Sequence, residues 1–250
     1  IFLSAAEAAG ASAVIVEDFS DEITLPQIKV DNSKNTLLKM IDSFYEHPTE
    51  DITVVGITGT NGKTTTTYLI HEILRRTGHN AGTIGTYGYS INDKKHKTNL
   101  TTPDIVQLFE IFHQMRQSNI EYVIMEVSSH SIAMNRIEEI KFNGAAFTNI
   151  SRDHLDFHKT IDNYAQKKAE LFSKIPRSGF TVINAEDQYA KLFENNSCAA
   201  NVTYSIHGNT DYSFSEGTTF SNGINGRLLY HDKIYDFHST LSGEFNMKNL

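Results

Sequence analysis

One seven-residue segment constrains the fold of this chain more than any other. Gly59-Thr60-Asn61-Gly62-Lys63-Thr64-Thr65 stands between residues 52–57, which are apolar and β-branched, and residues 66–76, which repeat apolar side chains at helical spacing. The first pattern is typical of a buried parallel strand and the second of an amphipathic helix. A glycine-rich turn between them leaves backbone N–H groups unpaired at one spot, where the helix dipole favours negative charge. The segment therefore predicts a phosphate-binding loop.

Two side chains of this loop suit triphosphate chemistry. Lys63 can reach the β- and γ-phosphates, and the Thr64 hydroxyl can bind Mg²⁺. The spacing departs from the general pattern, because Ile57 stands where that pattern has its first glycine. The alternative is a glycine-rich turn that precedes a lysine by chance. The agreement of strand, turn and helix favours the phosphate-binding loop.

Length, charge and cysteine content exclude several classes of function. A chain of 250 residues suits one large domain, or one domain with part of another. Its net charge is −8 and no run of Lys or Arg stands out, so no nucleic-acid partner is expected. The single cysteine, Cys198, excludes an intrachain disulfide and a multi-cysteine zinc site, and favours the cytoplasm. No apolar run approaches the roughly 20 residues of a membrane span.

The order of patterns predicts an α/β fold, with a mostly parallel sheet and helices on both of its faces. Residues 1–48 read as the end of one domain, with helices at 5–10 and 34–45 and strands at 13–17 and 28–30, and both chain ends look cut from a longer protein. Residues 49–250 read as a second domain. Its expected strands are 52–57, 82–86, 121–126, 144–149 and 179–184, and its expected helices are 62–77, 103–118, 161–175 and 186–194.

Two local signals refine this prediction. Thr101-Thr102 followed by Pro103 predicts a helix N-cap with proline at the first helical position. Residues 202–241 are rich in β-branched and aromatic side chains. They predict a small antiparallel region with turns at 208–209, 222–223 and 225–226.

Polar residues follow two of the expected strands. Glu126 ends an apolar strand and should face the phosphate-binding loop, where a carboxylate could hold Mg²⁺, although a solvated Glu at a strand end is the alternative. Residues 151–158 gather two His, two Asp and an Arg after the next strand, a set that could bind a divalent metal or position a phosphate. Lys167 and Lys168 alone read as a solvated basic face.

The loop at 59–65, the Glu126-Val127-Ser128-Ser129-His130 segment and residues 152–158 together resemble the Mur ligases. The likeness is greatest to the branch that adds the third amino acid of the peptidoglycan stem peptide. It covers nearly the whole chain, from the end of an N-terminal UDP-substrate-binding domain (1–48) through the central ATP-binding domain (49–250). The three motifs in this order are far more specific than the loop alone.

The resemblance implies roles for individual residues. ATP is expected on Gly59, Thr60, Asn61, Gly62, Lys63, Thr64 and Thr65, with Asn184 at the adenine. Mg²⁺ is expected on Thr64, Glu126, His154 and Lys168, the last as a carbamate formed with CO₂. A carbamate offers the anionic oxygen that Mg²⁺ prefers, whereas an ammonium would repel the ion. The UDP-linked substrate is expected on Thr101, Thr102, Ser128 and Arg136, while Leu100 and Met134 replace polar contacts of some relatives.

The implied activity is ATP-dependent formation of an amide, with Lys63, Glu126, His154 and Lys168 as the catalytic set. The implied substrates are UDP-N-acetylmuramoyl-L-alanyl-D-glutamate and an amino acid, either L-lysine or meso-diaminopimelate, and the implied protein is a monomer. Whether this chain alone completes ligation stays open, because the family binds the amino acid largely through a C-terminal domain.

The alternatives are another amide ligase of the same fold and a non-catalytic nucleotide-binding module. Folylpolyglutamate synthetases usually carry Gly-Ser where Thr64-Thr65 stands, and a related amidotransferase subunit needs four cysteines. A non-catalytic module would leave residues 151–158 and Lys168 without a purpose.

Overall fold

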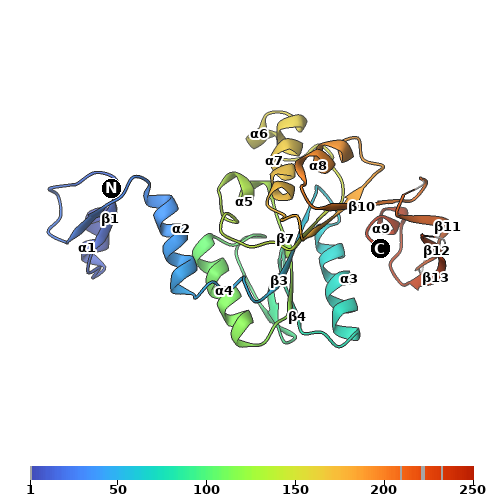
Figure 1. Cartoon of the computed structure of the whole chain (residues 1–250), viewed down its shortest axis with the longest axis horizontal. Coiled ribbons are helices and arrows are strands. Elements are labelled where there is room, and N and C mark those ends of the chain that lie inside the picture. Colours follow the sequence, from blue (N-terminus) through green and yellow to red (C-terminus); the bar gives the residue numbers. More distant parts are fainter. Residues whose placement is uncertain (1, 209, 221–222, 232) are drawn as a thin grey trace. The chain divides into compact units, whose positions relative to one another are not determined.

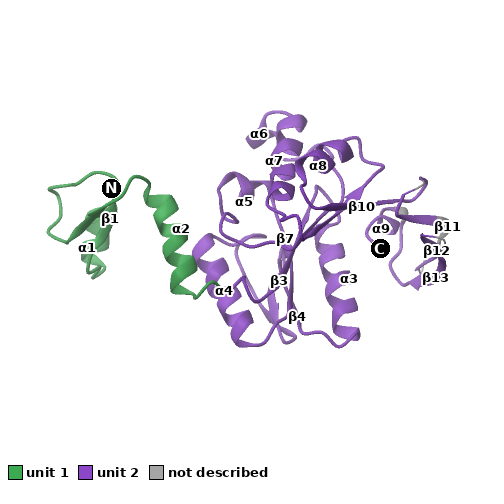
Figure 2. Ribbon diagram, in the orientation of Figure 1, with its two compact units in different colours: residues 1–47 green, residues 48–250 purple. Residues whose placement is uncertain are grey.

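The computed structural model describes residues 2–208, 210–220, 223–231 and 233–250. The chain divides into two compact units, residues 1–47 and residues 48–250 (Figure 2). The first unit contains α1 (Leu3–Ala8), β1 (Val14–Val16), β2 (Gln27–Lys29) and α2 (Ser33–Phe44), and β1 pairs with β2 in parallel. Its small core is made by Val14, Val16 and Ile23 with Leu3, Ala6 and Leu25 packed against them.

The second unit is built on one sheet of eleven strands in the order β13-β12-β11-β10-β9-β8-β3-β7-β4-β5-β6 (Figure 1). The central strands from β10 to β4 pair in parallel, which confirms the predicted α/β class. The strands are β3 (Thr53–Thr58), β4 (Ala81–Gly85), β5 (Gly88–Ile91), β6 (Lys94–His96), β7 (Tyr122–Glu126), β8 (Gly144–Phe147), β9 (Phe180–Asn184), β10 (Ala200–Ser205), β11 (Tyr212–Phe220), β12 (Gly223–Tyr230) and β13 (Lys233–Ser239). The helices are α3 (Lys63–Arg76), α4 (Ile105–Gln117), α5 (Ser129–Ala133), α6 (Leu155–His158), α7 (Ile161–Ser173), α8 (Ala190–Asn196) and α9 (Glu244–Met247).

Helices cover both faces of the sheet because β3 is apolar on both sides. Val55 and Ile57 belong to a core cluster against which Ile70 of α3 packs. Gly56 lies between these two residues, and the opposite face of β3 at Gly56 is covered by α7, since a Cβ placed there would lie 3.1 Å from Leu171. Successive strand residues point to opposite faces, so α3 and α7 lie on opposite sides of β3.

The two edges of the sheet differ. β6 is a short edge of Lys94, Lys95 and His96, all exposed, and short charged edges resist pairing with another chain. β13 is seven residues long and exposes Ile234 (60%) and Tyr235 (48%). Among the described strands, β13 is therefore the less protected edge.

Two predicted local features are wrong. Asp104, not Thr102, caps α4: its side chain accepts a hydrogen bond from the backbone N–H of Gln107, and Pro103 lies before the cap. Asn225-Gly226 lies inside β12 and forms no turn, because the β11–β12 and β12–β13 ladders run through both residues.

The turn predicted at 208–209 falls partly on a residue outside the described ones, and the antiparallel hairpin expected around it is absent from the described strands. β10 and β11 pair in parallel rather than as a hairpin, and Asn209 itself lies outside the described residues. The turn predicted at 222–223 joins antiparallel strands β11 and β12, although Asn222 lies outside the described residues. The sequence also failed to predict β5, β6 and β10. The predicted antiparallel region is confirmed in β11–β13, which continue the main sheet.

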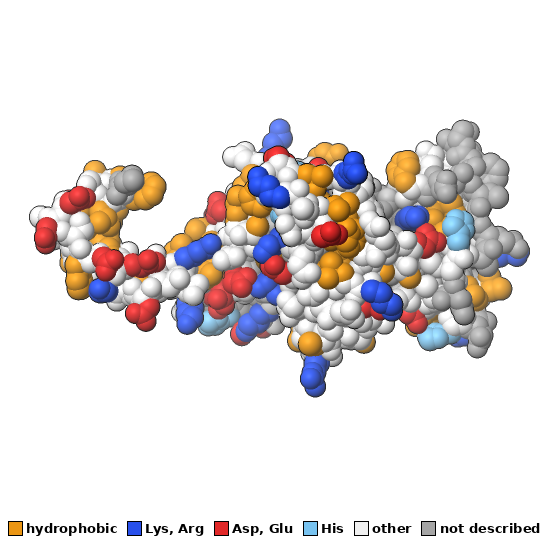
Figure 3. Space-filling view, turned by 90° about the horizontal axis from the view of Figure 1, so that it is seen from above, with side chains coloured by type: hydrophobic (Ala, Val, Ile, Leu, Met, Phe, Trp, Pro, Cys, Tyr) orange, Lys and Arg blue, Asp and Glu red, His pale blue; other side chains and the backbone are white. Residues whose placement is uncertain are grey.

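The surface carries charges of both signs. On the face shown in Figure 3, Lys and Arg side chains are interspersed with Asp and Glu rather than gathered by sign. An anionic ligand would therefore depend on local donors more than on a general positive field. In the described parts of the chain, every helix is too short or too polar to cross a membrane.

Candidate active site

The phosphate-binding loop (59–65) joins β3 to α3 and is held tightly by its backbone. Gly59 has φ +142°, and a Cβ there would lie 2.0 Å from Thr148 Oγ1. Gly62 has φ +87° and is the N-cap of α3. The Thr148 hydroxyl donates to the Asn61 carbonyl at 2.6 Å. Glycine is needed at Gly59 because a side chain there would collide with Thr148. It is needed at Gly62 because the backbone is left-handed there, a conformation that other residues rarely adopt.

Lys63 opens α3 and folds back over the loop. Its Nζ donates to the carbonyl oxygens of Gly59 (2.9 Å) and Thr60 (2.8 Å). Burial lowers the pKa of Lys63, while the charges of Glu126 and Asp153 oppose this shift. The lysine is thus kept close to the backbone N–H groups of the helix N-terminus, where a phosphate oxygen would add to its hydrogen bonds.

Glu126 ends β7 and is 1% exposed. The Thr64 hydroxyl donates to its Oε2 at 2.8 Å. Thr86, which follows β4, donates its backbone N–H to Oε1 at 2.9 Å and its hydroxyl to Oε2 at 3.1 Å. The predicted meeting of Glu126 with the phosphate-binding loop is therefore observed.

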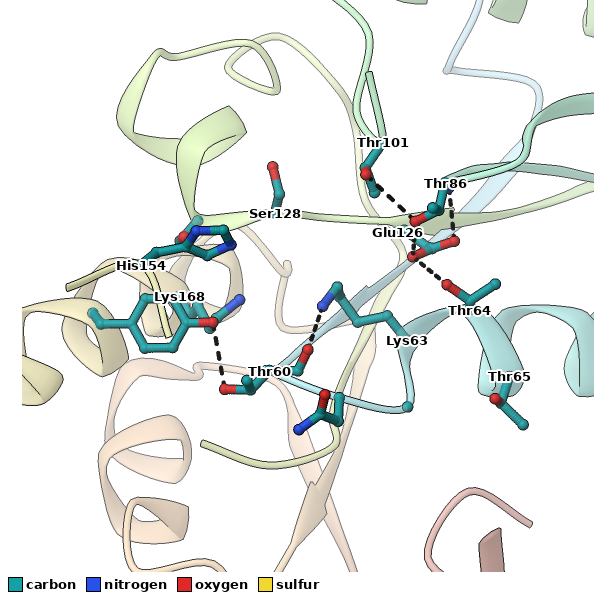
Figure 4. A pocket seen from close by; sticks show the side chains of 14 residues that line it. Thr60, Lys63, Thr64, Thr65, Thr86, Thr101, Glu126, Ser128, His154 and Lys168 are labelled. Carbon is teal, nitrogen blue, oxygen red and sulfur yellow. Dashed lines mark hydrogen bonds between the residues drawn. The ribbon is translucent and has the colours of Figure 1, made fainter. Parts of the chain in front are cut away.

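These groups line one cleft of about 360 Å³ (Figure 4). Figure 4 shows Lys63 between the Glu126–Thr64 pair on one side and Lys168 and His154 on the other. The lining residues are Thr60, Asn61, Gly62, Lys63, Thr64, Thr65, Thr86, Thr101, Glu126, Ser128, Ser129, His154, Tyr164 and Lys168. The cleft lies at the carboxyl ends of the parallel strands, where α/β sheets bind ligands.

Lys168 of α7 is 1% exposed, which contradicts the solvated basic face that composition alone suggested. Its Nζ donates to the Gly59 carbonyl at 2.8 Å and lies 4.6 Å from the centre of the Tyr164 ring. Burial lowers the pKa of Lys168 well below its usual range, and the nearby Lys63 ammonium lowers it further. The chain therefore favours a neutral amine here.

His154 precedes α6 in a left-handed conformation, with φ 51°. Its ring centre lies 4.8 Å from that of His130. Buried His158, four residues on, shares a 2.9 Å hydrogen bond with Ser129 Oγ, so the loops after β7 and β8 are joined. Burial lowers the pKa of His130 and His158, which favours neutral imidazoles beside His154.

Of the four residues predicted to bind substrate, Thr102, Ser128 and Arg136 are joined by hydrogen bonds, while Thr101 is bonded to Thr86 instead. The Thr102 hydroxyl is buried and donates to the Glu126 carbonyl oxygen at 3.0 Å. Arg136 donates to the Thr102 carbonyl at 3.1 Å. Thr101 and Ser128 line the cleft. Thr101 and Ser128 are thus placed to touch a ligand directly, whereas Thr102 holds the strand ends together.

Asn184 lies in a neighbouring cavity of about 570 Å³, which shares Asn61 and Gly62 with the cleft. It is 2% exposed and donates to the Thr148 carbonyl at 2.7 Å. The other lining residues are Asn149, Ile150, Ser151, Glu186, Asp187, Phe245, Lys248 and Asn249. The cavity therefore extends the phosphate-binding loop towards the end of β9.

Sequence reasoning missed several residues of these two cavities. Lys248 pairs with Glu186 at 2.9 Å, and a Cβ on Gly62 would lie 2.2 Å from Asn249 Oδ1. These contacts join segments that are distant in the chain, so no local sequence pattern predicts them. Thr86 could have been found, because it ends an expected strand just as Glu126 does.

The donor set suits a divalent cation bound together with phosphate oxygens. Among the described residues, no group of three or more His, Cys, Asp or Glu side chains is arranged to hold a metal by itself. The Glu126 carboxylate and Thr64 hydroxyl meet at 2.8 Å beside a loop shaped for phosphate. These are the hard oxygen ligands that Mg²⁺ takes, usually with substrate phosphates completing its shell. The site fits a Mg²⁺–nucleotide pair better than a protein-only metal centre.

Comparison with known proteins agrees with this geometry. Residues 57–250 match the model of the Mur ligase middle domain. A protein of Bacteroides thetaiotaomicron named UDP-N-acetylmuramoyl-L-alanyl-D-glutamate--2,6-diaminopimelate ligase is 36% identical over all of this chain and 51% of its own length. A Clostridium perfringens protein of the same name is 37% identical over 99% of this chain and 52% of its own.

A solved structure bearing that enzyme name superimposes with a TM-score of 0.85 at 28% identity. The superposition covers 99% of this chain and 51% of the other. The chain thus spans about half the length of the relatives that it matches.

Proposed function

The chain belongs to the Mur ligase family, and we propose that it is the ATP-binding part of an enzyme that joins an amino acid to UDP-N-acetylmuramoyl-L-alanyl-D-glutamate in peptidoglycan synthesis. Diaminopimelate is the proposed amino acid, because the named relatives carry it in their names. Residues 49–250 are proposed as the central ATP-binding domain, and residues 1–48 as the end of a domain that binds the UDP-linked substrate. The protein is proposed to act as a cytoplasmic monomer.

The observation that carries this proposal is the composition of the cleft. A phosphate-binding loop, a buried carboxylate and a buried lysine with a lowered pKa converge in one space of about 360 Å³. A simple nucleotide-binding module needs the loop alone. Thr101 and Ser128 stand on the far wall from the loop, where a second substrate could lie next to the terminal phosphate (Figure 4).

The proposed reaction has two steps. The γ-phosphoryl group of ATP passes to the D-glutamyl carboxylate, which gives ADP and an acyl phosphate. The amine of the incoming amino acid then attacks the acyl carbon, phosphate leaves, and an amide forms. Both reactants of the first step are anions, so positive charge and hydrogen-bond donors must be fixed before they meet.

This chain's residues would divide that task. The backbone N–H groups of residues 59–65 and the Lys63 ammonium would hold the phosphates. Asn184 and the cavity around it would take the nucleoside end. Glu126 and Thr64 would hold Mg²⁺, with His154 as a further metal ligand on the other side of Lys63, and the bound metal would neutralise charge on the phosphate oxygens.

Lys168 is proposed to carry a carbamate. A neutral amine adds to CO₂ and releases one proton, and burial beside Lys63 favours the neutral amine. The product is an anionic oxygen ligand in the wall of the cleft. It would sit between the loop and His154, where a cation bound by both could also meet it (Figure 4).

The test is ATP hydrolysis by the complete gene product with and without UDP-N-acetylmuramoyl-L-alanyl-D-glutamate. We expect phosphate release to depend on that substrate, and Lys63→Ala to reduce it by about 10²–10³-fold, as loss of a group that stabilises developing charge does. Lys191→Ala is the control, since Lys191 is a surface residue of α8 paired with Glu194. Release that is equally fast without the substrate would favour a generic ATPase instead.

A further inference from the structure

The placement of the Glu126 carboxylate is only partly explained by the assigned residues. Both of its oxygens accept hydrogen bonds from Thr86, one from the backbone N–H and one from the hydroxyl. Figure 4 shows Thr86 directly beside Glu126, on the side away from Lys63. Thr64 supplies the remaining donor at 2.8 Å. Two of the three donors to this carboxylate therefore come from one residue.

Gly85 makes this placement of the carboxylate possible. A Cβ on Gly85 would lie 2.2 Å from Glu126 Oε1 and 2.7 Å from its Cδ. Real side chains do not approach so closely, and Gly85 has no left-handed φ that would by itself demand glycine. The absence of a side chain at Gly85 thus leaves the space that the Glu126 carboxylate occupies.

The turn that presents Thr86 is fixed from behind. Thr86 and Tyr87 join β4 to β5, and β5 begins at Gly88 with φ +98°. A Cβ on Gly88 would lie 1.9 Å from the carbonyl oxygen of His96 in β6. The turn that carries Thr86 is thus followed directly by a close backbone contact between β5 and β6.

The proton of the Thr86 hydroxyl has a defined direction. A carboxylate only accepts hydrogen bonds, so Thr86 donates to Glu126. The Thr86 oxygen also lies 3.4 Å from Thr101 Oγ1, and with its own proton committed it must accept there. The hydrogen bond from Thr101 therefore helps to keep the Thr86 hydroxyl directed at the Glu126 carboxylate.

We propose that Gly85-Thr86 is a positioning element that holds the Glu126 carboxylate in the orientation needed for the divalent cation. This inference rests on the proposed function, because it takes Glu126 as a ligand of that cation. Partners that orient a metal ligand typically contribute 10–100-fold to metal affinity when they are removed. Thr86 acts through Glu126 and need not touch the cation.

The test is Mn²⁺ binding to the complete gene product in the presence of a non-hydrolysable ATP analogue, followed by electron paramagnetic resonance. Thr86→Val keeps the backbone N–H and removes the hydroxyl. We expect it to weaken Mn²⁺ binding about tenfold, with affinity for the metal-free analogue changed less than twofold. Thr86→Ser restores the hydroxyl and should bind Mn²⁺ within threefold of the wild type.

Gly85→Ala provides a second, independent perturbation. Its methyl group would displace the Glu126 side chain, so we expect Mn²⁺ affinity to fall at least as far as in Thr86→Val. Thr77→Val is the matched control, because Thr77 is an exposed threonine at the opposite end of α3. Thermal unfolding of each variant checks that the fold is kept.

The outcomes separate the two proposals. A wild-type protein that binds no nucleotide would refute the proposed function. If the wild type binds both nucleotide and Mn²⁺, and the Mn²⁺ affinity of Thr86→Val is within twofold of the wild-type value, the positioning role of Gly85-Thr86 is refuted and the proposed function is not. Equal losses of Mn²⁺ affinity in Thr86→Ser and Thr86→Val would also refute the positioning role, since the hydroxyl would then not be the group that orients Glu126.

Discussion

At the scale of single residues, two lysines meet at one carbonyl oxygen. Lys63 and Lys168 donate to the Gly59 oxygen at 2.9 and 2.8 Å. Two ammonium groups that close repel each other, and together with deeper burial this repulsion lowers the pKa of Lys168. The pair thus explains how a lysine can serve in a cleft built for a cation.

The first prediction concerns Lys168. Lys168→Ala in the complete gene product should reduce ligation by about 10²–10³-fold, because an anionic group next to the reacting phosphate is lost. Short carboxylic acids such as formate or acetate should restore part of the rate by supplying that oxygen in solution. The measurement is the initial rate of amide formation against acid concentration.

The control for this prediction stands next to it in the chain. Lys167 is paired with Glu170 at 2.6 Å on the outer side of α7, so Lys167→Ala should keep nearly the full rate. Full activity of Lys168→Ala without any added acid would rule out the carbamate.

How much of the site the sequence could predict depends on which contacts are local. Glu126 could be expected near Thr64, because carboxyl ends of parallel strands share one edge of a sheet. Thr86 could be expected there too, since it ends a neighbouring strand, but the close approach of Gly85 to Glu126 could not, because no local sequence pattern shows that contact. The contact of Asn249 with Gly62 joins positions that only the folded chain brings together.

At the scale of elements, α3 connects the phosphate-binding loop to the sheet. Its apolar face packs on the cluster that contains Val55 and Ile57. Two turns after the loop, His71 is buried and its Nε2 lies 3.2 Å from the Ala81 carbonyl of β4. A carbonyl oxygen only accepts, so His71 Nε2–H donates that bond and ties the helix to β4.

The second prediction follows from the charge state of His71. Burial lowers the pKa of His71 in the folded protein below its ordinary value of 6.5. Below pH 6.5 the unfolded chain therefore binds a proton that the folded chain does not, so stability is lost as pH falls from 6.5 towards the folded pKa. For one such group the slope is at most about 1.4 kcal/mol per pH unit.

Urea unfolding between pH 5 and 8 would measure this effect. We expect the free energy of unfolding of His71→Gln to fall less steeply below pH 6.5 than that of the wild type. His130 and His158 remain in both proteins, so the difference between the two curves isolates His71. Parallel curves throughout would show that His71 does not contribute.

At the scale of the whole molecule, each compact unit has a core of its own, and the cleft belongs to the second unit. The apolar cluster of Val14, Val16 and Ile23 draws only on residues 1–47. The residues that line the cleft and the cavity beside it all lie within 48–250. Each unit therefore holds its own buried residues, and the second holds the candidate site.

The third prediction is that residues 48–250 fold and bind nucleotide without residues 1–47. The expected result is a cooperative thermal transition and affinity for a non-hydrolysable ATP analogue within about threefold of the full chain, because no residue of the cleft is removed. Circular dichroism and fluorescence titration would measure the two properties. Lys63→Ala in the shortened chain is the control for specific binding. Loss of binding in a folded 48–250 would mean that residues 1–47 contribute to the site.

The unequal edges of the sheet have a practical consequence for work with this protein. Self-association through strand pairing would begin at β13, where Ile234 and Tyr235 stand exposed, and not at the lysine-bearing β6. A lysine introduced at position 234 would give β13 the same kind of protection and should keep concentrated samples dispersed. Crystallisation and storage would both gain from that one surface change, which lies far along the sheet from Glu126.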